Sequence, residues 1–212
     1  MVHFFLGKNG FPKKINIIEL GSGNGEMMNR IIITLKNFPE IFSKCNFLIY
    51  EKSPYLIKIQ KRKLANFKIK WIKSLKKVDK NFNIYLANEF FDAIPVKQFI
   101  KIKGYWFERY VDETNYKKTY LNIPINISKI KKIFPVKFLK NQTFLEYSPQ
   151  SNVILKQIAG NLKKSTGGLL IIDYGYSGFK MKDTVQSLYK HKKNHVLDNK
   201  FKSDITYTLN FS

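Results

Sequence analysis

The sequence predicts an α/β fold with a mostly parallel central sheet, and two observations carry this prediction. Five short apolar runs, rich in Ile and Phe, have the length of buried strands, and helix-length segments follow several of them. This alternation is typical of parallel sheets. The length of 212 residues suits one core, so we expect a single domain over residues 1–212 with an antiparallel insertion at about 96–144.

The first part of the chain contains predicted strands and helices in turn. Residues 15–20 (INIIEL) predict the first strand, and residues 26–38 have apolar side chains at near-helical spacing until Pro39 stops the helix. Pro54 suits the first turn of a second helix that reaches about Ala65. Three further strands are predicted at residues 46–51, 67–72 and 82–88.

The middle of the chain has a different pattern. Short alternating pieces between about 96 and 144 are separated by a turn at Lys103-Gly104, which predicts a β-hairpin inserted between the fourth and fifth strands. A helix over about 149–163 then leads into the fifth strand, residues 168–174 (GLLIIDY).

Charge and hydropathy narrow the possible partners. A net charge of +23 would ordinarily suggest nucleic acid or an anionic membrane surface. Nearly all of the basic residues are scattered lysines, however, as in chains from AT-rich coding sequences. No run approaches the roughly 18 apolar residues of a membrane-spanning helix, and the start of the chain lacks the pattern of a secretory signal. We expect no membrane span and keep nucleic acid only as an alternative partner.

Cysteine and histidine are too few and too scattered to predict a metal site. Cys45 is the one cysteine, which excludes an internal disulfide, and His3, His191 and His195 have no ligand spacing. We expect no metal and a reducing compartment: the bacterial cytoplasm or, as the alternative, the mitochondrial matrix.

A glycine-rich stretch follows the first strand in INIIELGSGNGE. Gly21, Gly23 and Gly25 allow a tight turn and close approach of a ligand to the backbone at the carboxyl edge of the sheet. The dinucleotide pattern G-x-G-x-x-G fails because Glu26 stands where the third glycine is required, and no Walker-type Lys-Ser or Lys-Thr is present. The stretch therefore disfavours NAD and excludes a P-loop.

Two carboxylates at strand ends point to a cofactor that carries positive charge. Glu51, at the end of the second strand, has the place of a carboxylate that accepts ribose hydroxyls. Glu19 suits an ammonium and a sulfonium rather than a phosphate. Together they favour S-adenosylmethionine, and the alternative is that both merely bond neighbouring backbone groups. The predicted cofactor-binding residues are Glu19, Gly21, Ser22, Gly23, Gly25, Glu51 and Asn88.

Four segments in order resemble the MidA family of class I methyltransferases: IIELGSGNGEMM, IYEKSPYLIKIQKRKL, ANEFFDAIPVKQF and IIDYGYSGFKMKDTVQSLYKH. The resemblance implies a Rossmann-like class I methyltransferase fold, S-adenosylmethionine as cofactor, and a protein arginine side chain, such as one in a respiratory complex I subunit, as acceptor. Family members usually have Gly-Pro-Gly-Arg-Gly-Thr where this chain has residues 21–26 (GSGNGE). They also carry further regions before the first strand and after Phe211, so we expect this chain to be truncated or minimal.

Acidic residues near the methyl group are the candidates for catalysis, because a protonated guanidinium must be oriented and must lose a proton. Glu89 and Asp92, after the fourth strand, and Asp173, after the fifth, are the predicted catalytic residues. Each has a plainer alternative: Asp92 caps a helical turn, Glu89 is structural, and Asp173 bonds the turn in DYGYSG.

Two other functions use the same cofactor-binding fold. In the first, the lysines hold RNA and Asn88 and Glu89 read a flipped base. In the second, the chain is an inactive assembly factor that binds the cofactor and a partner protein.

Overall fold

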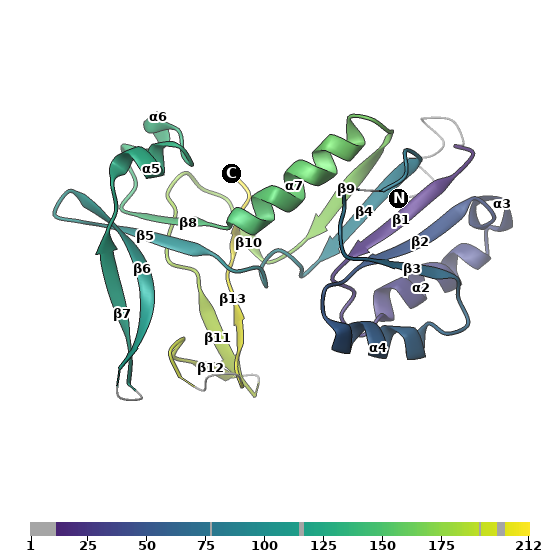
Figure 1. Cartoon of the computed structure of the whole chain (residues 1–212), viewed down its shortest axis with the longest axis horizontal. Coiled ribbons are helices and arrows are strands. Elements are labelled where there is room, and N and C mark those ends of the chain that lie inside the picture. The colour runs from purple at the N-terminus through teal and green to yellow at the C-terminus, as the bar shows by residue number, and fades with distance from the viewer. Residues whose placement is uncertain (1–11, 77, 115–116, 191, 199–201) are drawn as a thin grey trace. The chain divides into compact units, whose positions relative to one another are not determined.

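The computed structural model describes residues 12–212, apart from residues 77, 115–116, 191 and 199–201 (Figure 1). Contacts between residues divide the chain into two compact units. The first unit comprises Met1–Phe90 and Val153–Ile172, and the second comprises Phe91–Asn152 and Asp173–Ser212. Each unit has its own sheet and its own apolar core.

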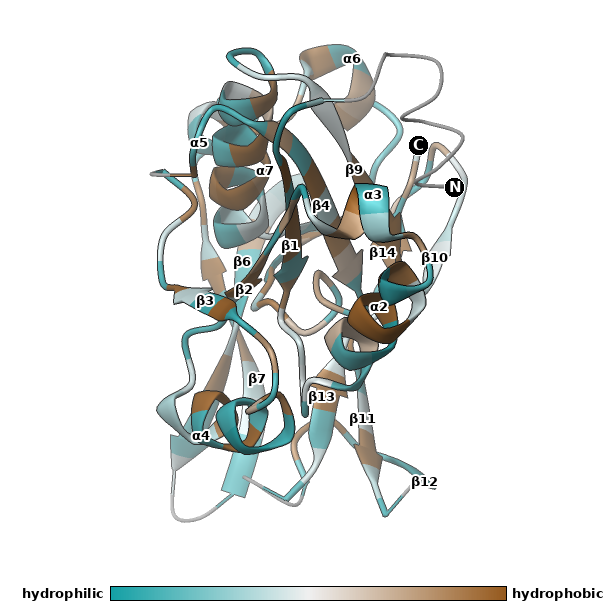
Figure 2. Cartoon of the chain, turned by 90° about the vertical axis from the view of Figure 1, so that its right-hand side faces the viewer, coloured by the Kyte–Doolittle hydropathy of each residue, from teal (hydrophilic) through white to brown (hydrophobic). Residues whose placement is uncertain are grey.

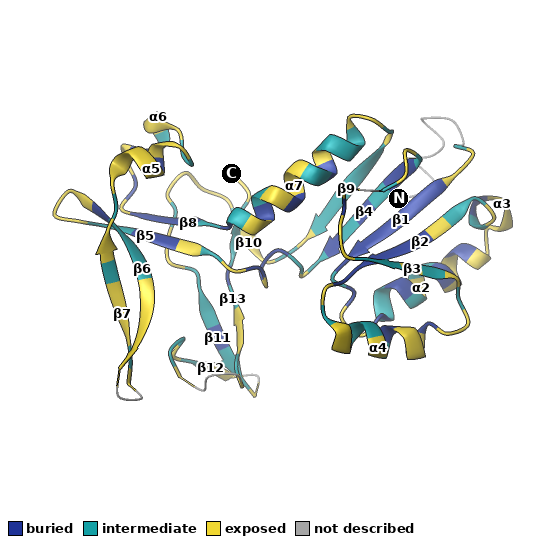
Figure 3. Cartoon of the chain, viewed as in Figure 1, coloured by how far each residue is buried: buried dark blue, intermediate teal, exposed yellow. Residues whose placement is uncertain are grey.

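The first unit is built on a five-stranded sheet in which every neighbouring pair is parallel. The strand order is β3-β2-β1-β4-β9, which confirms the predicted parallel sheet. All residues of β1 are buried (Figure 3), as expected for the central strand of a sheet covered on both faces. The strands are β1 (Ile15–Leu20), β2 (Cys45–Tyr50), β3 (Ile69–Ile72), β4 (Phe82–Asn88) and β9 (Gly167–Ile172).

Helix α2 (Glu26–Lys36) covers part of this sheet. Its buried side chains Met28, Ile32 and Leu35 recur at helical spacing and pack into a core with residues of β1 and β2. Helix α2 carries both hydrophobic and hydrophilic residues (Figure 2). The predicted helix over 26–38 is two residues too long, because the chain turns before Pro39 and a new short helix, α3 (Pro39–Phe42), begins there.

Two further helices start and end close to the predicted positions. Helix α4 (Pro54–Lys63) begins with Pro54, and the Ser53 hydroxyl caps it by accepting the backbone N–H of Leu56 at 3.3 Å. Helix α7 (Pro149–Leu162) leads to β9.

The second unit contains a four-stranded antiparallel sheet in the order β7-β6-β5-β8. Lys103 and Gly104, with φ of 48° and 85°, form the turn between β5 and β6, which confirms the predicted hairpin. The short helices α5 (Ile127–Lys131) and α6 (Val136–Leu139) follow β7 and contribute to the core of this unit. The strands are β5 (Lys97–Ile102), β6 (Tyr105–Thr114), β7 (Lys117–Pro124) and β8 (Phe144–Tyr147).

Short strands from the last 40 residues or so complete the second unit. Two form a small parallel pair, and three form an antiparallel sheet in the order β12-β11-β13. They are β10 (Gly175–Tyr176), β11 (Gln186–Tyr189), β12 (Lys192–Asn194), β13 (Asp204–Thr206) and β14 (Leu209–Asn210). Within the described part of the chain, no helix is long and apolar enough to cross a membrane.

Candidate functional site

The loop from β1 to α2 is shaped by three glycines with left-handed backbone. The φ angles are 65° at Gly21, 51° at Gly23 and 87° at Gly25, values that residues with a Cβ atom rarely adopt. The N–H of Gly25 donates to the carbonyl of Ser22 at 2.7 Å, and the N–H of Gly21 donates to the carbonyl of Tyr50 at 3.0 Å. The loop is therefore a tight turn that is anchored to β2.

The three glycines differ in what surrounds them. A Cβ atom at Gly21 would lie 2.6 Å from the Phe90 ring, and one at Gly25 would lie 3.1 Å from the Leu64 side chain. A Cβ atom at Gly23 would meet nothing within 4 Å. Gly21 and Gly25 are thus needed for packing, whereas Gly23 presents open backbone that a ligand can approach.

The buried carboxylate of Glu19, near the end of β1, holds this loop by a hydrogen bond to Ser22. Glu19 is only 2% exposed, and its Oε2 accepts the Ser22 hydroxyl at 2.7 Å. Burial raises the pKa of Glu19, against the opposing hydrogen bonds from Ser22 and the backbone N–H of Met28. Helix α2 has no side-chain cap at its N-cap residue. Glu19, on the preceding strand, instead accepts a backbone N–H from the first turn of this helix, that of Met28.

Glu51 stands at the carboxyl end of β2, the strand next to β1. It is 8% exposed, and its Oε1 accepts the backbone N–H groups of Lys52 at 2.8 Å and Ser53 at 2.9 Å. Its Oε2 accepts the Gln60 side-chain amide at 3.3 Å. Three donors therefore fix the orientation of this carboxylate.

Gln60 is a site residue that the sequence analysis misses. It is fully buried on α4, and its amide also donates to the carbonyl of Gly23 at 2.9 Å. A signal for it exists in the sequence: Gln60 lies four residues after Leu56 and four before Leu64, so it shares their face of a helix. A glutamine on an apolar helix face needs buried polar partners.

Asn88 and Glu89 lie at the carboxyl end of β4, on the other side of β1 from β2. Glu89 is exposed and has a φ of 45°, and its backbone N–H donates to the carbonyl of Ile172 at 2.9 Å. A glutamate in the left-handed region is uncommon and occurs where surrounding structure holds it. The structure thus places the glycine loop, Glu51, Asn88 and Glu89 at one edge of the first unit's sheet.

Asp92 and Asp173 belong to the second unit and lie together there. Asp173 Oδ2 accepts the backbone N–H groups of Phe91 at 3.0 Å and Asp92 at 3.3 Å, and its Oδ1 accepts that of Tyr174 at 2.8 Å. Asp92 is 6% exposed, and its carbonyl accepts the N–H of Tyr207 at 3.2 Å. The alternative for Asp92, capping of a helical turn, does not apply, because residues 91–94 form a turn without a helix before β5 begins.

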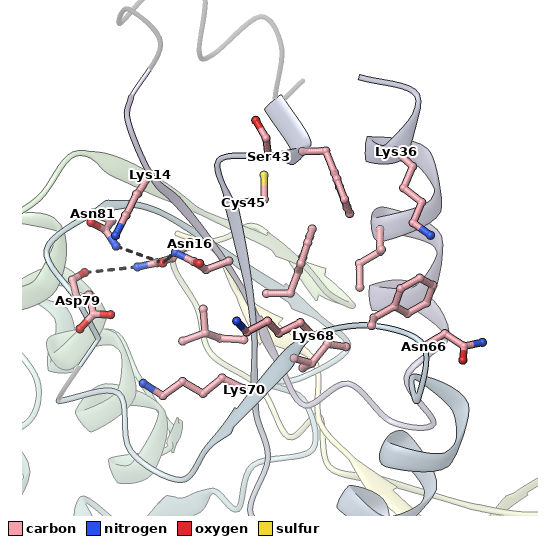
Figure 4. A pocket seen from close by; sticks show the side chains of 17 residues that line it. Lys14, Asn16, Lys36, Ser43, Cys45, Asn66, Lys68, Lys70, Asp79 and Asn81 are labelled. Atoms are coloured by element: carbon pink, nitrogen blue, oxygen red, sulfur yellow. Dashed lines mark hydrogen bonds between the residues drawn. The ribbon is translucent and has the colours of Figure 1, made fainter. Parts of the chain in front are cut away.

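The edge at the opposite ends of the strands contains a cavity of about 760 Å³. Residues at the starts of β1, β2 and β3 line it, and Asn16 donates there to the Asp79 carbonyl at 3.5 Å (Figure 4). Burial raises the pKa of the Cys45 thiol, which also lines it, to about 11. This cavity is remote in the sheet from the glycine loop, because all five strands run in one direction.

Within the described residues, no group of three or more His, Cys, Asp or Glu side chains is placed to hold a metal ion. His3 and His191 lie outside the described residues.

Two solved structures share the fold of this chain. A protein from Burkholderia thailandensis matches 99% of the chain with a TM-score of 0.79 and 17% identity, over 57% of its own length. A second structure from the same organism, bound to S-adenosyl-homocysteine, matches 99% of the chain with a TM-score of 0.77 and 17% identity, over 56% of its own length.

Curated relatives match almost the whole chain. It is 27% identical to "Protein arginine methyltransferase NDUFAF7, mitochondrial" of Xenopus tropicalis and 26% identical to the human protein of that name. Each match covers 96% of this chain but 53% and 51% of those proteins, so the chain spans about half the length of these relatives.

A family model described as "Putative S-adenosyl-L-methionine-dependent methyltransferase" matches residues 3–212. This match and the relatives confirm the resemblance to the MidA family. The chain belongs to this family of S-adenosylmethionine-dependent methyltransferases.

Proposed function

We propose that this chain carries the cofactor site of a methyltransferase that uses S-adenosylmethionine to methylate an arginine side chain of a protein. One observation carries the proposal: the open backbone of Gly23 and the fixed carboxylate of Glu51 lie at the ends of neighbouring parallel strands. Ligands of open parallel sheets bind at this edge. The family description and the relatives' names support the choice of cofactor and acceptor.

The residues at this edge fit the cofactor in different ways. Glu51 is the acceptor for a ribose hydroxyl, and Gly23 admits the ligand to the loop backbone. Glu19 is held by Ser22 and by α2, so its role in the proposal is to support the loop rather than to contact an ammonium group directly. Gly21 and Gly25 keep the loop compact.

The bound cofactor supplies a methyl group on a sulfonium, which an acceptor nitrogen attacks in line as the carbon–sulfur bond breaks and its electron pair stays on sulfur. The chain must position the acceptor and take up the proton that the nitrogen loses. A guanidinium is protonated at neutral pH, so carboxylates suit this task. Glu89 is our first candidate because it is exposed at the carboxyl edge of the sheet.

Asp92, Asp173 and Asn88 have supporting roles in the proposal. Asp173 bonds three backbone N–H groups, which suits a residue that holds the segment after Glu89 in place. Asp92 is buried in the second unit, and Asn88 ends β4. The acceptor protein that the MidA resemblance implies, a complex I subunit, belongs to the same proposal, as does a mitochondrial or bacterial cytoplasmic location.

Calorimetric titration with S-adenosylhomocysteine tests the cofactor site. We expect saturable binding that Glu51→Ala and Gly23→Val each weaken at least about tenfold, the loss of one charge-assisted hydrogen bond or of ligand access. Gly104→Val is the matched control, because Gly104 also has a left-handed φ and open surroundings but lies in the β5–β6 turn. A folded chain that does not bind the ligand would refute the proposal.

Transfer of a tritiated methyl group to arginine-containing peptides then tests the acceptor class. Label on arginine that Glu89→Gln abolishes, with ligand affinity unchanged, is the expected result. Label on RNA instead, with RNA binding that falls steeply as the salt concentration rises, would establish the RNA alternative. The net charge of +23 is the observation that favours this alternative. Binding with no transfer to either would establish the assembly-factor alternative.

A further inference from the structure

The side-chain amide of Gln60 joins three separate parts of the first unit. Its Nε2 donates to the carbonyl of Gly23 in the glycine loop at 2.9 Å and to Glu51 Oε2 at the end of β2 at 3.3 Å. Its Oε1 accepts the indole N–H of Trp71 on β3 at 2.9 Å. Gln60 has 0% exposure, so all three hydrogen bonds are made away from solvent.

The donor and acceptor inventory fixes which way this amide points. An indole N–H can only donate, so Trp71 must face the oxygen end of the amide. The carbonyl of Gly23 and the carboxylate of Glu51 can only accept, so they must face the nitrogen end. A flipped amide would place like groups against each other at all three contacts, and the buried network therefore has one satisfied arrangement.

The same inventory shows what Gln60 leaves available on Glu51. A carboxylate has about four acceptor positions. Lys52 and Ser53 take two on Oε1, and Gln60 takes one on Oε2. About one position on Oε2 remains for a ligand hydroxyl, and its direction is set by the Gln60 amide.

We propose that Gln60 is a positioning residue of the cofactor site, which holds the Gly23 loop and the Glu51 carboxylate in the geometry that the ligand requires. The inference rests on the proposed function, because it assumes that the ligand contacts Gly23 and Glu51. Neither contact needs Gln60 to touch the ligand. Its effect on affinity arises because the loop and the carboxylate are ordered before binding, which lowers the entropy lost on binding.

Replacement of Gln60 by the apolar, similarly long methionine removes both donors. Affinity of Gln60→Met for S-adenosylhomocysteine should fall about tenfold to a hundredfold, as for loss of hydrogen bonds to a charged group. Lys58→Met is the matched control on the same helix, because Lys58 is exposed, and its affinity should match that of the natural chain. Thermal unfolding without ligand shows whether each variant is folded.

A second variant separates positioning from packing. In Gln60→Glu the new carboxylate faces Glu51 and the Gly23 carbonyl and can donate only when it is protonated. Two adjacent carboxylates share one proton readily, so affinity of Gln60→Glu should rise at least about tenfold between pH 8 and pH 5.5 relative to the natural chain. The charged groups near Gln60 are Lys61, which lies over the Trp71 ring, and Lys63, which pairs with Glu26. Gln60→Met should show no such rise.

A double-variant cycle with Glu51→Gln completes the test. If Gln60 acts through Glu51, the loss caused by Gln60→Met should be smaller in the Glu51→Gln background than in the natural chain. Equal losses in both backgrounds, or unchanged affinity and a flat pH profile in the Gln60 variants, would overturn the inference while ligand binding by the natural chain upholds the proposed function. A natural chain that does not bind would overturn the proposed function itself.

Discussion

In the first unit the central strand β1 is buried along its whole length and packs against α2, whereas in the second unit β6 and β7 are exposed along most of theirs. A parallel sheet covered on both faces is stabilised mainly by apolar burial. The hairpin of β6 and β7 in the second unit buries far fewer of its side chains. Something other than a thick apolar core must therefore order the segments of the second unit.

A polar network centred on the buried side chains of Gln98 and Glu146 has this role in the second unit. Glu146 accepts the Gln98 amide at 2.9 Å and the backbone N–H and hydroxyl of Thr184 at 3.0 and 2.5 Å. Asp183 accepts the same Gln98 amide at 2.8 Å and Arg109 at 2.6 Å. The network ties residues 183–184 to β5, β6 and β8. The first sheet is thus stabilised mainly by apolar burial, whereas the second unit depends on this polar network as well as on its smaller apolar core.

The largest expected effect is on the apolar core of the first unit. Ile17 is 1% exposed on β1, and Ile17→Ala should lower the free energy of unfolding by about 2–5 kcal/mol through lost burial and a residual cavity. Ile205 on β13 is 52% exposed, and Ile205→Ala should cost less than about 1 kcal/mol. Urea denaturation measures both. Equal losses would break the contrast between the buried strand β1 and the exposed strand β13.

The next effect is on the polar network. Glu146→Ala removes one acceptor from each of three donors, and the partly buried Thr184 backbone N–H then loses its partner, which should lower the free energy of unfolding by about 2–4 kcal/mol. Asp112→Ala is the control, because Asp112 is exposed on β6 and bonds only a nearby side chain in the described structure. A Glu146→Ala chain as stable as the control would show that burial alone orders the second unit.

A smaller effect follows from the raised pKa of Glu19. Its folded pKa lies above the unfolded value near 4.5, so the folded chain binds more protons, and stability from this group is present below that pH and is lost as pH rises through the folded pKa. Relative to Glu19→Gln, the natural chain should lose melting temperature from about pH 4.5 upward. Relative to Glu26→Gln, the melting temperature of the natural chain should instead rise with pH, because ion pairs with Lys63 and Arg30 lower the pKa of Glu26. Parallel curves for Glu19→Gln and the natural chain would contradict the role of burial.

The sequence predicts most of the first unit because the signals there are local. Apolar runs mark its five strands, and Pro54 marks a helix start that the structure confirms. Pro39, which was predicted only to stop a helix, instead begins the short helix α3. The strands from β8 onward, apart from β9, are only two to four residues long. Such short strands are defined by pairing with distant partners, and no periodicity reveals them.

The site is predictable to the same extent. The glycine spacing predicts the tight loop, and strand-end position predicts that Glu51 lies at the same edge of the sheet. The contacts of Glu19 and Gln60 are not predictable, because they depend on which side chains the fold brings together: Gln60 reaches Gly23 across 37 residues of sequence. The catalytic roles of Glu89, Asp92 and Asp173 that the sequence predicts stay predictions.

A crystal structure of the chain with S-adenosylhomocysteine tests the central claim most directly. The account predicts that a ribose hydroxyl lies within hydrogen-bond distance of Glu51 Oε2, with the Gln60 amide unmoved and the ligand against the Gly23 backbone. Ligand in the cavity beside Asn16 and Cys45, at the opposite edge of the sheet, or ligand with no contact to Glu51, would contradict it.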